Sequence, residues 1–186
     1  RDWFGWAIDV SGNTAVLSSV AEEHPYVYVF EFEGSTWSNT ATIQPDLAAI
    51  DLAFDGDVLV TAGRGYDDPE ICTPAEPNCN TGIVLLYERD SSGSDEWVFR
   101  KHLDGHRVPQ AQFGGEMQVD GDVIVVSAAS EDVESPVVMS GDRLQASTQA
   151  IENAGAIYIY ERNAGGPDNW GLVQRIEQAL GMARSI

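Results

Sequence analysis

The feature that most constrains the fold is an internal repeat. Residues 4–19 ("FGWAIDVSGNTAVLSS") align with residues 113–128 ("FGGEMQVDGDVIVVSA"). Both begin with Phe-Gly, have a glycine eight positions after the Phe, and continue into an apolar run that ends in small residues. Residues 48–63 ("AAIDLAFDGDVLVTAG") keep this layout with Ala48-Ala49 in place of Phe-Gly. Self-similarity at matched spacing is typical of repeat architectures.

Two further blocks follow each copy in the same order. The second is an apolar segment that closes on an aromatic residue and Glu, at Phe30-Glu31, Tyr87-Glu88 and Tyr160-Glu161. The third begins with Trp and reaches an aliphatic residue six positions later. Its members are Trp37 and Ile43, Trp97 and Leu103, and Trp170 and Ile176. Three blocks in one order make a chance resemblance untenable.

These blocks divide the chain into repeats at residues 1–46, 47–109 and 110–178. The remaining residues, 179–186, contain "LGMARSI", which overlays "FGWAIDV" of the first repeat. The sequence therefore predicts three complete repeats and the first strand of a fourth.

Each repeat is predicted to form four β-strands. An Asp-Gly or Ser-Gly pair joins the first two, and we expect a type I′ hairpin turn there, because Gly and Asp tolerate a positive φ. The second and third strands are apolar on both faces, which predicts burial between neighbouring sheets. The fourth strand is mixed and carries Arg100, Lys101 and His102, as expected of an edge. The fold class predicted is all-β, with four-stranded antiparallel blades stacked as a β-propeller.

With these motifs, the chain resembles the FG-GAP repeats of integrin α-type β-propellers and their secreted microbial branch. The "FG" element stands at Phe4-Gly5 and Phe113-Gly114 and is Leu180-Gly181 in the last copy. The "GD" after the first strand stands at Gly56-Asp57 and Gly121-Asp122. The resemblance implies a segment of a larger, seven-bladed propeller, with calcium sites and partner-binding surfaces in its loops.

The two cysteines, Cys72 and Cys79, lie in the loop "CTPAEPNC". No further ligands with zinc spacing follow them. They are either a local disulfide that pins the loop or two unpaired thiols. A disulfide would indicate an oxidising compartment, so we expect an extracellular or cell-surface protein.

The charge of the chain excludes several partners. Ten basic and 30 acidic residues give a formal net charge of −20. Such a surface repels phosphate backbones and anionic lipids, so we expect neither nucleic-acid binding nor membrane insertion. No apolar run approaches the length of a membrane-spanning helix.

The connections between the second and third strands differ greatly in length, which is typical of the functional part of a fixed scaffold. Two of them carry acidic clusters, and carboxylate-rich loops are the usual calcium ligands. The clusters are Asp67, Asp68 and Glu70, and Glu131, Asp132 and Glu134. They are either calcium sites or solvated acidic loops. The hairpins "DLAFDG" and "EMQVDG" are interpreted as plain turns.

Catalysis has little support in the sequence. His102, Asp104 and His106 alternate along an extended segment, which indicates either a metal site or a solvated edge. No nucleophile elbow and no phosphate-binding loop is present. We therefore expect a protein that is not an enzyme.

Three functions remain as hypotheses. The first is an extracellular binding or adhesion module whose variable loops present a surface to a protein or glycan, with calcium as its only expected cofactor. The second is a structural subunit of a filament or surface layer, with copies of itself as partners. The third is a secreted hydrolase or lyase built on a propeller.

Overall fold

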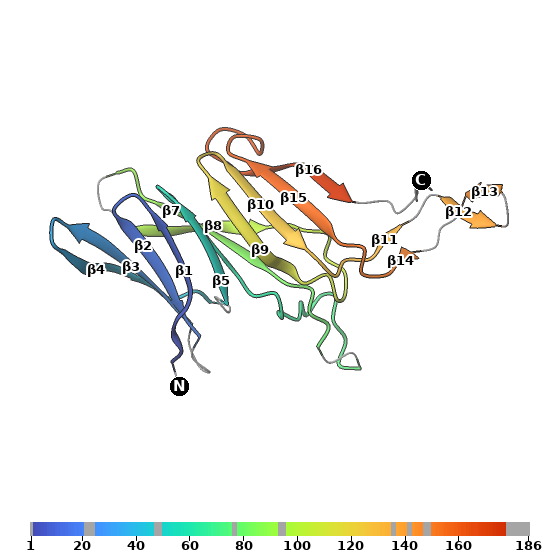
Figure 1. The fold of residues 1–186 in the computed structure, drawn as a ribbon, viewed down its shortest axis with the longest axis horizontal. Coiled ribbons are helices and arrows are strands. Elements are labelled where there is room, and N and C mark those ends of the chain that lie inside the picture. The colour runs from blue at the N-terminus through green and yellow to red at the C-terminus, as the bar shows by residue number, and fades with distance from the viewer. Residues whose placement is uncertain are drawn as a thin grey trace, which may run out of the picture.

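The computed structural model describes residues 2–20, 25–46, 50–75, 78–92, 96–134, 137–140, 143–146 and 150–177. Across this part of the chain the fold is all-β (Figure 1). The predicted strand of a fourth repeat, within 179–186, lies outside the described residues, as do Ala48 and Ala49.

Three four-stranded antiparallel sheets follow one another along the chain, and in each the strands pair in sequence order. Sheet 1 contains β1 (Phe4–Ser11), β2 (Thr14–Ser19), β3 (Tyr26–Glu33) and β4 (Thr36–Ile43). Sheet 2 contains β5 (Asp51–Asp55), β6 (Val58–Ala62), β7 (Val84–Arg89) and β8 (Trp97–Leu103). Sheet 3 contains β9 (Phe113–Asp120), β10 (Val123–Ala128), β15 (Ala156–Glu161) and β16 (Gly171–Glu177). The predicted strands are therefore present, with the polar fourth strand at an edge of each sheet.

The hairpin turns differ from the prediction by one residue. The two loop residues are Gly12-Asn13, Gly56-Asp57 and Gly121-Asp122, and the preceding Ser or Asp ends its strand. In each turn the glycine has a positive φ, between 53° and 58°, while the second residue does not. One positive φ at the first loop position is the pattern of a type II′ turn. The predicted type I′ turn is wrong because only the glycine takes the left-handed conformation.

The sheets pack face to face in a row, with β1, β5 and β9 beside one another (Figure 1). One apolar cluster fills the space between sheets 1 and 2, and a second fills the space between sheets 2 and 3. In sheet 2, β6 is buried throughout and β7 nearly so, as its two apolar faces predict. In sheets 1 and 3 the corresponding strands are covered on one face only, so for them the predicted burial between two sheets is wrong among the described residues.

The Phe-Gly pair of sheet 3 stands where β9 crosses sheet 2. The Phe113 ring is buried and packs edge-on against Tyr158, with ring centroids 5.2 Å apart. Gly114 has φ +89°, and a Cβ there would lie 2.7 Å from the Ala62 Cβ and 2.9 Å from the Val84 Cγ2. The small residue at the end of β6 and the glycine of β9 thus permit the close approach of two backbones.

One carboxylate links all three sheets. Asp55, at the end of β5, accepts a hydrogen bond from the Ser11 hydroxyl of sheet 1 at 2.7 Å and one from the Gly121 backbone N–H of sheet 3 at 2.8 Å. These two bonds hold the pKa of the Asp55 carboxyl below its usual value of 3.8. The hairpin ends of the sheets are therefore tied together at one residue.

The third connection is more structured than a loop. Within residues 129–155, β11 (Val133–Glu134) pairs with β14 (Ala150–Ile151), and β12 (Val137–Ser140) pairs with β13 (Arg143–Ala146). Figure 1 shows the β12–β13 hairpin at the end of the molecule farthest from sheet 1. The sequence predicted variation in length here and missed these strands.

Candidate functional site

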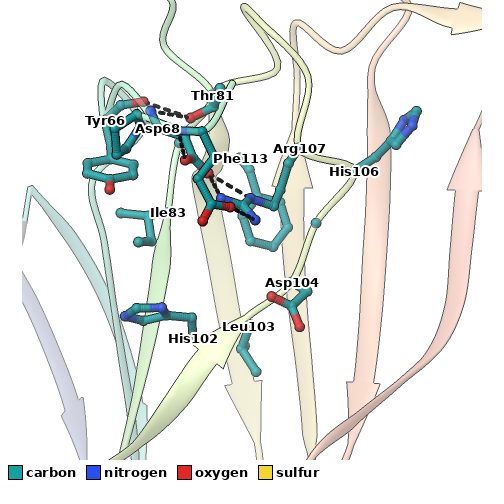
Figure 2. A pocket seen from close by; sticks show the side chains of 14 residues that line it. Tyr66, Asp68, Thr81, Ile83, His102, Leu103, Asp104, His106, Arg107 and Phe113 are labelled. Atoms are coloured by element: carbon teal, nitrogen blue, oxygen red, sulfur yellow. Dashed lines mark hydrogen bonds and ion pairs between the residues drawn. The ribbon is translucent and has the colours of Figure 1, made fainter. Parts of the chain in front are cut away.

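A pocket of about 330 Å³ lies where sheets 2 and 3 meet. It is bounded by two connections, one between β6 and β7 and one between β8 and β9. Its lining consists of Tyr66, Asp68, Pro69, Glu70, Thr81, Gly82, Ile83, His102, Leu103, Asp104, Gly105, His106, Arg107 and Phe113. Figure 2 shows Tyr66, Ile83 and His102 along one side, with Asp104 opposite.

The β6–β7 connection is held in shape by several bonds. Cys72 and Cys79 form a disulfide, so the prediction of a local bridge is confirmed. The Asp67 carboxylate accepts the Asn80 backbone N–H at 2.7 Å, which joins the two ends of the loop. The Gln110 N–H donates to the Cys79 carbonyl at 2.6 Å, which ties this loop to the β8–β9 connection. The pocket wall is therefore fixed by the fold itself.

An ion pair closes the rim of the pocket. The buried Asp68 carboxylate is bound by the Arg107 guanidinium, whose Nε lies 2.6 Å from Oδ2 (Figure 2). Burial raises the pKa of Asp68, but the Glu70 backbone N–H and Arg107 lower it further, so that it lies below 3.8. Glu70 adds a second contact, 3.1 Å from Arg107 Nη1. Asp68 is thus ionised at neutral pH and anchors the loop to the next connection.

The neighbouring residue, His106, makes the equivalent link to the other acidic loop. Its Nδ1 lies 3.2 Å from Oε1 of Glu131, which is fully buried. Arg175 donates to the same oxygen at 2.6 Å, and the Tyr158 hydroxyl donates to Oε2 at 2.7 Å. Burial and the nearby Glu131 raise the pKa of Tyr158 to about 12. Consecutive residues of the β8–β9 connection therefore clamp both acidic loops.

The six predicted calcium ligands lie on both sides of this connection rather than around one centre. Among the described residues no group of three or more His, Cys, Asp or Glu side chains is arranged to hold a metal ion. Five of the six carboxylates already contact donors of the protein. Asp67 accepts from the Asn80 N–H, Asp68 and Glu70 bind Arg107, Glu131 binds Arg175, and Asp132 accepts from the Asn153 N–H at 2.8 Å. Glu134 is exposed. Binding of calcium stays a prediction, and Glu131 would have to release three donors to take part.

The alternating His102, Asp104 and His106 do not form a triad at one point. His102 and Asp104 face each other across the pocket, while Figure 2 shows the His106 ring directed away toward sheet 3. The sequence analysis missed Arg107, which immediately follows these residues, and Tyr66. The available signal was an arginine in a strongly acidic chain, because such an arginine has many carboxylates with which it can pair.

The pocket combines an aromatic ring, an aliphatic wall and groups of both charges. Tyr66 and Ile83 offer apolar contact, while Asp104, Glu70 and His102 offer hydrogen-bonding groups. Such a mixture suits recognition of a polar ligand. Nothing in this group pairs a nucleophile with a base.

No family model matches the chain, and no curated protein matches it. Within the described part of the chain, no helix has the length and apolar character needed to span a bilayer.

Proposed function

We propose that this chain is a non-catalytic extracellular binding module, whose loops at the junction of sheets 2 and 3 take a ligand. The observation that carries the proposal is the pocket wall, which a disulfide, the Asp68–Arg107 ion pair and the Gln110–Cys79 hydrogen bond hold in one conformation. A wall ordered in advance reduces the entropy that a ligand loses on binding.

The charge of the molecule limits the kind of ligand. A formal net charge of −20 repels anions, so a neutral or basic ligand is favoured. A sugar unit meets the pocket's chemistry, because its ring face packs on Tyr66 while its hydroxyls bond Asp104, Glu70 and His102. A basic side chain of a partner protein is the alternative that the same carboxylates support.

We further propose that the three sheets are blades of a larger β-propeller of the FG-GAP type. Support comes from the four-stranded meander repeated three times and from the side-by-side packing of the first strands. The apolar faces of sheets 1 and 3 support it as well, because in a propeller each such face is covered by another blade. The disulfide supports an extracellular location.

A structural role as a self-assembling subunit is the second candidate. The observation that favours it is the row of exposed apolar side chains along one face of β1, formed by Phe4, Trp6, Ile8 and Val10. Rows of this kind mark protein–protein contact surfaces.

The binding proposal is tested on an array of neutral glycans and basic peptides. We expect binding by the unchanged chain, and a loss of about tenfold or more in affinity when His102→Ala and Asp104→Asn are combined. Glu152→Gln, an equally exposed change outside the pocket, is the control and should bind normally. A Cys72→Ser and Cys79→Ser variant should also bind more weakly, because its loop is no longer ordered in advance.

Two outcomes would count against the proposal. If the His102 and Asp104 variant binds as well as the unchanged chain, the ligand does not use this pocket. If no probe binds at roughly 100 μM, the structural role becomes the better account.

A further inference from the structure

The same three-residue unit joins both pairs of neighbouring sheets. Arg89 of sheet 2 donates to Glu31 of sheet 1 at 2.8 Å, and its guanidinium lies over the Trp97 ring, 5.3 Å from the centroid. Arg162 of sheet 3 donates to Glu88 of sheet 2 at 2.5 Å and lies 5.0 Å from the Trp170 centroid. In each case an arginine of the later sheet, stacked on its own tryptophan, binds the glutamate of the earlier sheet.

Glu161 is the corresponding glutamate of sheet 3. The pairing of second and third strands establishes the equivalence, because Thr14 pairs with Glu31, Val58 with Glu88 and Val123 with Glu161. Glu31 and Glu88 each bind an arginine, whereas Glu161 is exposed and its carboxylate accepts no bond from any described residue. Sheet 3 therefore presents an acceptor of the repeated unit with its donor missing.

The apolar surface around Glu161 matches the surfaces that are covered in the other sheets. In sheet 2, Val84 and Leu103 are 0% and 3% exposed beneath sheet 3. The equivalent residues of sheet 3, Ile157 and Ile176, are 42% and 43% exposed. The face has the composition of an interface between sheets, but among the described residues nothing covers it.

A second copy of this chain does not complete the unit. Its free face is that of sheet 1, where Phe32 occupies the position of Arg89 and Arg162 and packs on Trp37, with ring centroids 5.3 Å apart. A copy would supply apolar contact and leave the Glu161 carboxylate without its cation.

We propose that the outer face of sheet 3 binds a further blade of this repeat type, one whose third strand ends in Glu-Arg, and that its arginine pairs with Glu161. The inference rests on the proposal that the three sheets are propeller blades, and it adds the residue code by which one blade recognises the next.

The test gives sheet 1 the missing arginine. In Phe32→Arg, the new guanidinium stacks on Trp37 as Arg89 does on Trp97, so sheet 1 of one copy should dock on sheet 3 of another. We expect sedimentation velocity to show the unchanged chain at 20.2 kDa and concentration-dependent association of the variant. Adding Glu161→Gln should weaken that association about tenfold or more, since a charged hydrogen bond is lost. Adding Glu152→Gln, the matched control, should leave it unchanged.

Four results would overturn the inference. One is a folded Phe32→Arg variant that sediments as the unchanged chain does. Another is an unchanged chain that already associates through this face and is insensitive to Glu161→Gln, which would make a second copy the occupant. The third result separates the proposal that the sheets are propeller blades from the proposal that an arginine pairs with Glu161. Association of Phe32→Arg that Ile157→Ser abolishes and Glu161→Gln does not would retain the blade-like face and reject the arginine. In the fourth result, neither Ile157→Ser nor Glu161→Gln weakens the association of Phe32→Arg. That result would reject the blade-like face as well as the pairing of an arginine with Glu161.

Discussion

Trp170 donates its indole N–H to the Glu88 carboxylate at 2.9 Å, across 82 residues and from one sheet to the next. Arg162 binds the same oxygen, and Arg100 of Glu88's own sheet binds the other at 2.9 Å. Glu88 is buried and Trp170 almost completely so. The junction of sheets 2 and 3 thus has a carboxylate at its centre with three donors around it.

Removing this charge should destabilise the protein strongly. We expect Glu88→Gln to lower the free energy of unfolding by about 3 kcal/mol, because two arginines lose their counter-ion in a partly buried site. Glu161→Gln is the matched control, since it makes the same change at the same position of sheet 3. In Glu161→Gln the loss in the free energy of unfolding should stay within about 0.5 kcal/mol. Urea denaturation of both variants measures the difference, and equal losses would contradict the assigned role of Glu88.

Two glycines with the same backbone conformation allow crowding to be separated from strain. Gly5 and Gly114 both have a positive φ, +81° and +89°. A Cβ at Gly5 would meet only the Ile8 Cδ1, at an ordinary 4.0 Å, whereas a Cβ at Gly114 would lie 2.7 Å from the Ala62 Cβ and 2.9 Å from the Val84 Cγ2. We expect Gly5→Ala to lower the free energy of unfolding by about 1 kcal/mol, from the strain of the left-handed backbone alone. Gly114→Ala should cost about 3 kcal/mol, because overpacking is added. Thermal and urea unfolding of the pair should rank them in this order.

One buried hydroxyl is a site for stabilisation. The Thr61 Oγ1 has no hydrogen-bond partner in the described structure, and Leu17 and Val126 stand at the equivalent positions of sheets 1 and 3. Thr61→Val should therefore stabilise the protein by about 1 kcal/mol. Thr81→Val is the control of opposite sign, because the Thr81 hydroxyl donates to the Tyr66 carbonyl at 3.0 Å and accepts from the Asp68 N–H. A denaturant midpoint that rises in both variants would contradict this account.

Asp55 should make stability depend on acid pH. The hydrogen bonds from Ser11 and Gly121 lower the pKa of Asp55 in the folded protein. At a pH above the usual pKa of 3.8, Asp55 therefore makes its full contribution to the free energy of unfolding. That contribution is lost as the pH falls through 3.8 toward the lower folded pKa, because protonation removes the charge that the donors stabilise. Unfolding of the unchanged chain and of Asp55→Asn should therefore differ at neutral pH and converge in acid. A difference that does not change with pH would argue against this assignment.

Calcium binding is tested by thermal unfolding with chelator and with millimolar calcium. A cation that binds only the folded state must raise stability, by about 2.7 kcal/mol at a hundred times its dissociation constant. If calcium binds, we expect the midpoint to rise and Asp132→Asn or Asp67→Asn to reduce the rise. An unchanged midpoint would reject the prediction.

The regular parts of the fold follow from local sequence, and the site does not. Apolar runs, a mixed fourth strand and Gly-centred turns predicted the four strands of each repeat, because these signals act within a few residues. The arginine pairs could not be found in this way, since Arg89 and Glu31 are 58 residues apart and Arg162 and Glu88 are 74 apart. Glu131 is the clearest case. Its acidic neighbours predicted either a calcium site or a solvated loop. In the structure Tyr158 and Arg175, from two strands of sheet 3, converge on Glu131, and its side chain is buried.

Phe32 stands in sheet 1 at the position where sheets 2 and 3 have an arginine. Sheets 2 and 3 each extend an arginine toward the sheet before them, and sheets 1 and 2 each extend the glutamate that binds it, so the row of sheets has a direction. Sheet 1 alone among the three has no cation to extend. In a ring of the kind we propose, sheet 1 would bring apolar contact and no arginine to the joint behind it. We expect such a ring to open first at that joint.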